Sequence, residues 1–525
     1  MDEGRDAGIF IGGGGPDYAT PQHLLPAYAN RHGLIAGATG TGKTVTLQIL
    51  AESFSARGVP VFLSDVKGDL SGLGASGSAE AKLHGAFTER AGRIGFADYA
   101  YRAFPVTFWD LFGAKGHPVR TTVSEMGPLL LARLLELSEA QEGVLNIAFR
   151  VADEQGLALL DLKDLQALLV WVGQNRQDLS LRYGNVATAS IGAIQRRLMV
   201  LEGQGGDRLF GEPALELGDL FLADDAGLGR INILAADTLM QSPRLYATFL
   251  LWLLSELFET LPEVGNPDKP KLVFFFDEAH LLFDDAPKAL VDKVEQVARL
   301  IRSKGVGVYF VTQNPADVPE DILGQLGNRV QHALRAFTAK DQRELRQAAQ
   351  NYRANPAFDI EDAIREVGTG EAVTSMLERK GVPGVAERTL IRPPSSQLGP
   401  IADATRAELM GLSPVAGKYD APVDRESAFE ILRARAEQAA REAEAAAVAA
   451  GPEAEAPAAR EFNAARRYSG TRAGGSTARS GVSRGGSSRS DSVAQTFAKS
   501  FARQLGTKSG QALVRGVLGG IFRGR

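Results

Sequence analysis

Short apolar runs alternate with amphipathic stretches along the first part of the chain. The runs at 33–36, 61–64 and 106–109 have the composition of buried strands, and residues 45–54 carry apolar side chains at helical spacing. Strands that alternate with helices in this way are typical of parallel βαβ units. The sequence therefore predicts an α/β fold with a mainly parallel sheet.

The alternation stops and later resumes. Between about 128 and 221 the strand signals thin out and helical periodicity takes over, which predicts a mostly helical insertion. Strand-like runs then return at 229–234, 271–276, 306–312 and 329–334. Because their separations suit helical crossovers, we expect one sheet that the insertion interrupts and that the later strands complete.

The composition changes after about residue 419. Residues 430–450 are nearly all Ala, Glu and Arg, which predicts a solvated helix, and 468–490 are rich in Gly, Ser, Arg and Thr, as in a flexible linker. The last stretch spaces apolar residues around Lys and Arg, which predicts a basic amphipathic tail. The predicted parts are 1–127 and 222–418 for the core, 128–221 for the insertion, 419–490 for a helix and linker expected to be disordered, and 491–525 for the tail.

The loop after the first predicted strand fits the phosphate-binding pattern G-x-x-x-x-G-K-[ST]. Its backbone N–H groups and the next helix N-terminus would face phosphates, Lys43 would reach the β- and γ-phosphates, and the Thr44 hydroxyl would coordinate Mg²⁺. The alternative is a chance glycine-rich turn. The candidate nucleotide-binding residues are Gly37, Ala38, Thr39, Gly40, Thr41, Gly42, Lys43 and Thr44.

Two adjacent acids end the apolar run at 271–276. In that position Asp277 would lie near the Mg²⁺ shell and Glu278 would orient and polarise the attacking water, so the pair favours hydrolysis over phosphoryl transfer to another substrate. The alternative is a buried strand with an ordinary polar end. The run at 306–312 ends in Gln313, which we interpret as a sensor of the γ-phosphate or the attacking water.

Several cations lie just ahead of the run at 306–312. Arg302 is our candidate for an arginine that enters a neighbouring subunit's site, with Arg299 one helical turn away as the other choice. Ordinary favourable cations at a helix C-terminus are the alternative. Arg329 and Arg335 are weaker candidates for the same role.

Composition excludes some classes of site and leaves others open. There is no cysteine, and the six histidines lack metal-ligand spacing, so thiolate chemistry is excluded and a zinc site is not expected. The net charge of −5 gives no whole-chain attraction to nucleic acid. The N-terminus lacks a secretory pattern, and the most apolar run, 245–257, is shorter than the roughly 20 residues of a spanning helix. We expect a cytoplasmic protein in which that run is a buried core helix.

Together these motifs resemble the HerA/FtsK branch of P-loop motor ATPases, and more closely the stand-alone bacterial HerA-like proteins of the YjgR type. The resemblance runs from about residue 29 to about 394. Besides the nucleotide motifs, the strings that carry it are 31–35 (RHGLI), 65–70 (DVKGDL), 116–122 (GHPVRTT), 125–128 (EMGP) and 312–315 (TQNP).

The resemblance implies a RecA-like core that binds ATP and Mg²⁺ and assembles as a homohexamer, with nucleotide at subunit boundaries and DNA in the pore. It assigns phosphate and metal roles to Lys43, Thr44 and Asp277, water activation to Glu278, sensing to Gln313 and the trans arginine to Arg302. The sequence departs from archaeal-type HerA in leaving no room for a β-barrel before the loop at Gly37. That departure puts a resection role in doubt.

Two functions remain open at this point. The first is an ATP-hydrolysing ring that moves DNA, as a translocase or a helicase-like protein. The second is an ATPase that remodels or recruits a protein, or docks peripherally on a membrane through its basic tail, without moving DNA. Both would use the same hydrolytic site, so the site residues do not separate them.

Overall fold

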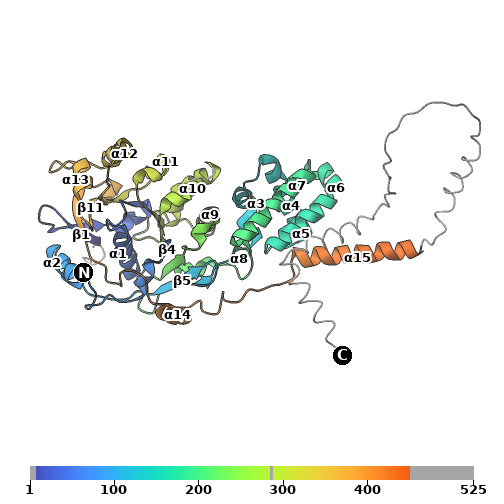
Figure 1. Cartoon of the computed structure of the whole chain (residues 1–525), viewed down its shortest axis with the longest axis horizontal. Helices are drawn as coiled ribbons and strands as arrows, with labels where there is room; N and C mark the ends of the chain where they lie inside the picture. Colours follow the sequence, from blue (N-terminus) through green and yellow to red (C-terminus); the bar gives the residue numbers. More distant parts are fainter. Residues whose placement is uncertain (1–7, 284–287, 450–525) are drawn as a thin grey trace, which may run out of the picture. The chain divides into compact units, whose positions relative to one another are not determined.

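The computed structural model describes residues 8–283 and 288–449 (Figure 1). Contacts divide the chain into two compact units. The first contains the described residues up to Leu145, Leu160–Leu162 and Arg196–Asp424, and the second contains Asn146–Leu159, Lys163–Gln195 and the described residues from Arg425 onward. The linker predicted at 468–490 and the tail predicted at 491–525 lie outside the described residues.

A single mixed sheet organises the first unit. Within the described residues it has twelve strands, in the order β2-β1-β12-β11-β10-β3-β9-β8-β4-β7-β5-β6. From β10 to β6 all neighbours are parallel, which confirms the predicted α/β fold with a mainly parallel sheet. The strands are β1 Ile9–Gly14, β2 Thr20–Leu24, β3 Gly33–Ala36, β4 Val61–Asp65, β5 Val106–Asp110, β6 His117–Pro118, β7 Ile231–Ala235, β8 Leu272–Phe276, β9 Val306–Thr312, β10 Asn328–Gln331, β11 Glu371–Ser375 and β12 Glu387–Ile391.

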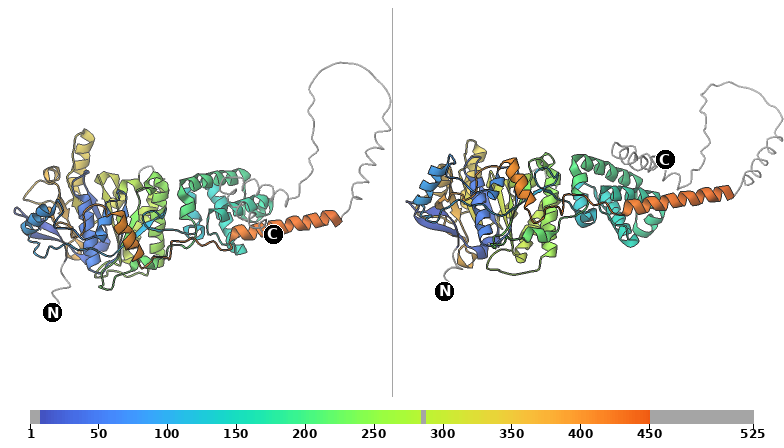
Figure 2. Two further views of the ribbon diagram at one scale, coloured as in Figure 1. Left: turned by 60° about the horizontal axis from the view of Figure 1, so that its bottom comes forward. Right: turned by 90° about the horizontal axis from the view of Figure 1, so that it is seen from below.

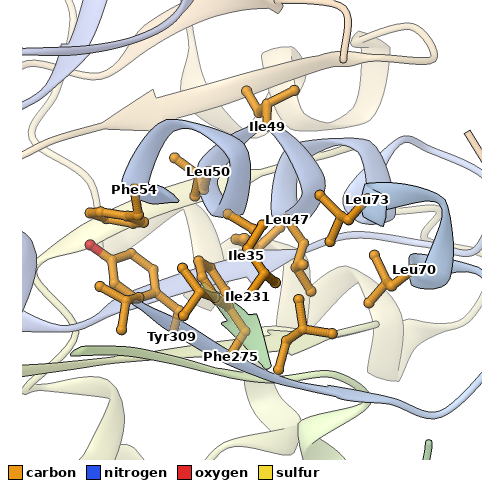
Figure 3. Close-up of a cluster of buried hydrophobic side chains, with 14 of the residues drawn as sticks. Ile35, Leu47, Ile49, Leu50, Phe54, Leu70, Leu73, Ile231, Phe275 and Tyr309 are labelled. Atoms are coloured by element: carbon orange, nitrogen blue, oxygen red, sulfur yellow. The ribbon is translucent and has the colours of Figure 1, made fainter. Parts of the chain in front are cut away.

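Every residue of the central parallel strands β3, β4, β8 and β9 is buried, as expected for strands covered on both faces. Helix α1, Lys43–Ala56, covers one face with Leu47, Leu50 and Phe54, which point down onto Phe275 and Tyr309 of the sheet (Figure 3). This packing fixes the position of α1 over β3. It also fixes the position of the loop that connects β3 to α1. Because Leu47, Leu50 and Phe54 are at most 1% exposed, the helix cannot shift without opening a cavity.

Four strands that the sequence did not predict extend the sheet on its antiparallel side. β1 pairs with β2 and with β12, and β12 pairs with β11, so segments more than 350 residues apart lie side by side. Small residues are needed in β1, because a Cβ atom at Gly12 would lie 2.1 Å from the Leu390 carbonyl oxygen. The glycines that permit this approach gave the segment the composition of a loop.

The helices cover the sheet and form the second unit. α9 is the buried helix predicted around the apolar run 245–257, and none of the helices in the described part of the chain is long and apolar enough to span a membrane. The helices are α1 Lys43–Ala56, α2 His84–Arg93, α3 Val123–Leu134, α4 Glu139–Gln155, α5 Leu162–Gln174, α6 Arg176–Tyr183, α7 Thr188–Leu201, α8 Asp207–Leu209, α9 Pro243–Thr260, α10 Lys288–Ile301, α11 Glu320–Leu323, α12 Ala339–Gln350, α13 Ile360–Glu366, α14 Asp403–Gly411 and α15 Ala428–Ala449.

The second unit joins helices from distant parts of the chain. The buried carboxylate of Asp164 accepts hydrogen bonds from the Ser427 hydroxyl, at 2.5 Å, and from the Phe429 N–H, at 2.8 Å, at the start of α15. The first turns of α15 therefore pack on the helices from 146–195, while its later turns extend away from them (Figure 2). The sequence predicted α15 as a solvated helix, and its beginning is buried at Ala428 and Leu432.

Candidate active site

The predicted nucleotide motifs meet at one edge of the sheet. The loops after β3, β9, β8 and β4 carry Lys43, Gln313, Glu278 and Lys67, and these four strands are neighbours in that order. Because the strands are parallel, their carboxyl ends lie at the same edge, where open α/β sheets place their ligands. β9 lies between β3 and β8, so Gln313 is positioned between the glycine-rich loop and the acidic pair.

The glycine-rich loop is fixed to the strands beside it. The N–H of Gly37 donates to the Thr312 carbonyl at the end of β9, and the N–H of Ala38 donates to the Ala333 carbonyl after β10. Gly40 and Gly42 have φ values of 79° and 119°, which favour glycine. Gly42 is the N-cap of α1 and provides no side-chain cap, so the first-turn N–H groups are available to an anion.

Lys43 turns back onto its own loop. Its Nζ donates to the carbonyl oxygens of Gly37, at 2.6 Å, and of Ala38, at 3.2 Å, and the side chain is buried. Burial lowers the pKa of Lys43, and the nearby charge of Glu278 acts against that shift. The lysine is thus held at the mouth of the loop, from which it can transfer to a phosphate oxygen.

His332, directly after β10, supports the loop from below. Its Nδ1 lies 2.9 Å from the Glu371 carbonyl oxygen and its Nε2 lies 2.8 Å from the Thr46 hydroxyl on α1. A carbonyl only accepts, so Nδ1 carries the proton and Nε2 accepts from Thr46. The ring is wholly buried, and this burial lowers the pKa of His332 to about 4.

We expect His332 to make folding stability depend on pH. Between about pH 6.5 and pH 4, His332 is protonated in the unfolded chain, where its pKa is near 6.5, but stays neutral in the folded protein. The free energy of unfolding therefore falls as the pH falls through this range. The difference in unfolding free energy between wild type and His332→Gln should shrink by about 2 kcal/mol from pH 7 to pH 5, as measured by denaturant unfolding. Raised carboxyl pKa values oppose this trend, but they are common to both proteins and cancel in the difference. A difference that stays constant would contradict the assignment.

Asp277 is held at the end of β8 by neighbouring polar groups. Its N–H donates to the Ser64 hydroxyl on β4 at 3.2 Å, and the Tyr246 hydroxyl of α9 donates to the same Ser64 oxygen at 2.9 Å. Burial, and then the charge of Glu278, raise the pKa of Asp277 to about 7. A buried carboxylate in this state is stabilised by a cation, as expected of a metal ligand.

Glu278 is almost fully buried, with its backbone in the left-handed region at φ 49°. One carboxylate oxygen pairs with the Lys67 ammonium, and the other lies 3.4 Å from both Gln313 Nε2 and His280 Nδ1. Burial alone would raise the pKa of Glu278, but the hydrogen bond and charge of Lys67 outweigh it and leave the pKa below its ordinary value. The left-handed conformation is costly for glutamate, and such strain is concentrated at functional sites.

The loop after β4 is organised by its own carboxylates. Asp65 accepts hydrogen bonds from the N–H groups of Gly68, at 2.7 Å, and Leu70, at 3.1 Å, and burial, with the charge of Asp69, raises its pKa to about 6. Burial raises the pKa of Asp69, while hydrogen bonding to Thr44 acts in the opposite direction. Asp65 therefore shapes the loop, and Asp69 faces the first turn of α1.

These residues fit a nucleotide with Mg²⁺. The loop provides free N–H groups, and oxygen atoms of Thr44, Asp69 and Asp277 are the hard donors that Mg²⁺ prefers. One buried oxygen of Asp69 has no hydrogen-bond partner. In the described part of the chain no three His, Cys, Asp or Glu side chains cluster as a metal site, so phosphate and water oxygens would complete the shell.

The candidate arginines lie elsewhere. Arg302 begins the 3-10 turn Arg302–Lys304 at the amino end of β9, which places it about 20 Å along the strand from Gln313. It cannot reach the site of its own subunit. Arg299 is exposed and pairs with Glu295. Arg329 donates to three backbone carbonyls, a structural role, and Arg335 is exposed at the same sheet edge as Lys43.

Two residues near the site were not predicted. Lys67 lies within the string 65–70 that carries the family resemblance, but the sequence assigned it no role. His332 belongs to a set of scattered histidines, and its position under the loop follows from the pairing of β10 with β3, which no local pattern reveals. The signal that could have identified Lys67 is its position as a single cation between Asp65 and Asp69.

Comparison with solved structures finds a bacterial conjugative coupling protein and VirB4. The conjugative coupling protein TrwB, in an unbound form, is 14% identical, with a TM-score of 0.47 over 74% of this chain and 91% of that chain. VirB4 of Thermoanaerobacter pseudethanolicus is 15% identical, with a TM-score of 0.47 over 76% of this chain and 98% of that chain.

Comparison by sequence identifies the family. The DNA double-strand break repair helicase HerA of Sulfolobus acidocaldarius is 26% identical over 149 residues, which are 28% of this chain and 29% of that protein. The chain thus aligns with less than a third of that relative. The family model for the HerA-like helicase C-terminal region matches residues 14–525, which confirms the resemblance seen in the sequence motifs. The chain belongs to this HerA-like family of P-loop motor ATPases.

Proposed function

We propose that the protein is an ATP-hydrolysing, ring-forming motor that moves along DNA as a translocase or helicase-like protein. The observation that carries the hydrolytic part is the position of Glu278, next to Gln313 and across from the glycine-rich loop. The family match supports a motor, and the curated relative is a DNA repair helicase. A cytoplasmic location and a homohexamer belong to the same proposal.

In this mechanism the chain binds ATP through the loop 37–44, and Lys43 leaves the carbonyls of Gly37 and Ala38 to hold the phosphates. Thr44 and Asp277 would hold Mg²⁺, which would supply positive charge to neutralise the phosphates. Glu278 orients the attacking water and accepts its proton. The amide oxygen of Gln313 lies 3.5 Å from the Thr39 hydroxyl, and its amide nitrogen faces Glu278. Gln313 thus connects the phosphate-binding loop to Glu278 and can transmit the presence of the γ-phosphate to that carboxylate.

The DNA part of the proposal is tested by displacement of a third strand from triplex DNA. A translocating protein displaces the strand only when ATP is present, and Glu278→Gln should not displace it. ATP hydrolysis without displacement, and without any effect of DNA on the rate, would favour the other function. In that function the ring remodels or recruits a protein, or docks on a membrane surface through residues 491–525.

Arg302→Ala should lose ATP hydrolysis while the isolated subunit still binds nucleotide. The physical reason is distance, because Arg302 lies at the opposite sheet edge from its own site and can stabilise transition-state charge only in a neighbouring subunit. Mixing Arg302→Ala with Lys43→Ala subunits should restore part of the turnover, since some interfaces then combine an intact loop with an intact arginine. Arg299→Ala is the matched control, and loss of activity there instead would reassign the role.

A further inference from the structure

Both carboxylate oxygens of Glu278 contact neighbouring side chains. A general base needs a free lone pair to accept a proton from water. Here one carboxylate oxygen is engaged by the Lys67 ammonium, and the other faces Gln313 and His280 at 3.4 Å. The side chain of Glu278 is 5% exposed, so little water competes with these contacts.

The loop that carries Lys67 is built to keep this contact. Asp65 fixes its turn through the N–H groups of Gly68 and Leu70, and β4 lies directly beside β8, from which Glu278 projects. The Lys67 side chain is 43% exposed on a flexible stem, so the ammonium can leave without disturbing the packed core. Its charge also acts on Lys43, which places it within electrostatic reach of the phosphate loop.

We propose that Lys67 is an autoinhibitory latch: it pairs with Glu278 in the nucleotide-free subunit and releases Glu278 when a nucleoside triphosphate binds. Release follows from competition, because the triphosphate brings several negative charges close to the same ammonium. Glu278 can then activate water only after the ion pair opens. This inference rests on the proposed ATPase function and adds a positioning residue to it.

Cross-linking tests the contact without any turnover. A water-soluble carbodiimide activates a carboxylate, and a neighbouring amine then displaces the urea by-product and forms an amide. In nucleotide-free full-length protein we expect a Lys67–Glu278 cross-link by mass spectrometry. Its yield should fall about fivefold with Mg²⁺ and a non-hydrolysable ATP analogue, a change that corresponds to about 1 kcal/mol. The exposed pair Lys115–Asp237, after β5 and β7, is the internal control and should not respond.

The results of the cross-linking distinguish failure of the latch from failure of the ATPase proposal. Absence of the cross-link in the nucleotide-free protein, or an equal yield with bound analogue, overturns the latch and leaves the ATPase proposal standing. Failure of the analogue to bind, measured by calorimetry, overturns the ATPase proposal, and the latch falls with it.

Steady-state kinetics test whether the Lys67–Glu278 ion pair affects ATP turnover. Lys67→Met, which keeps the stem and removes the charge, should lower KM about fivefold with kcat unchanged, because ATP then binds without having to open an ion pair of about 1 kcal/mol. Lys67→Arg restores the pairing charge and should return KM toward the wild-type value. Lys115→Met, the matched control, should leave both parameters unchanged. A KM for Lys67→Met at or above that of wild type overturns the latch, provided that its thermal melting matches wild type.

Discussion

Glu278→Gln binds ATP at least as tightly as wild type and loses turnover by a factor of about 10² to 10⁴, the range of a general base. Glutamine has the shape of glutamate but cannot take a proton from water. The substitution leaves the phosphate loop untouched, because Glu278 contacts it only through Gln313 and Thr39. Binding is measured by calorimetry with Mg²⁺–ATP, and turnover by release of phosphate.

The control for Glu278→Gln is Asp237→Asn. Asp237 is a carboxylate at the same sheet edge, paired with Lys115 after β5 and not with a residue of the site. This variant should turn over at the wild-type rate. Retained turnover in Glu278→Gln would contradict the role of Glu278, and loss of ATP affinity would show that the side chain also shapes the binding site.

Lys43→Ala weakens ATP binding by about tenfold to a hundredfold, as expected for loss of a charge-assisted contact to phosphate, and turnover falls below detection. The ammonium contributes in the bound state, whereas in the free protein it only satisfies the carbonyls of Gly37 and Ala38 at the loop mouth. Calorimetry gives the affinity and thermal melting checks the fold.

Lys43→Arg extends that test. An arginine keeps the charge but is planar and longer, and the buried position leaves little room for it. It should bind ATP better than Lys43→Ala and still hydrolyse it slowly. Equal affinity of Lys43→Ala and wild type would contradict a phosphate role for this loop.

The parallel part of the sheet was predictable because its strands are long apolar runs. β9 was predicted at its observed bounds, and β8 differs by one residue, since both are buried on two faces and read as continuous hydrophobic segments. The antiparallel strands were not predictable in this way. β1 consists largely of glycine, and β11 and β12 gain their positions from pairing with segments far away in the sequence.

The residues of the candidate site also fall into a predictable group and an unpredictable group. Lys43, Thr44, Asp277 and Glu278 follow from local motifs, because the chemistry of phosphate binding requires fixed spacings. Lys67 and His332 act across strands, and their roles depend on which strands are neighbours. The joining of α15 to Asp164, more than 250 residues earlier, is likewise a tertiary contact without a local signature.

The most direct measurement of the central claim is steady-state ATP hydrolysis by the full-length protein, with and without single- and double-stranded DNA, alongside its mass in solution. We expect hydrolysis by a hexamer-sized species that DNA accelerates. An assembled ring that hydrolyses ATP at the same rate with and without DNA, or a protein that hydrolyses no ATP, would contradict it.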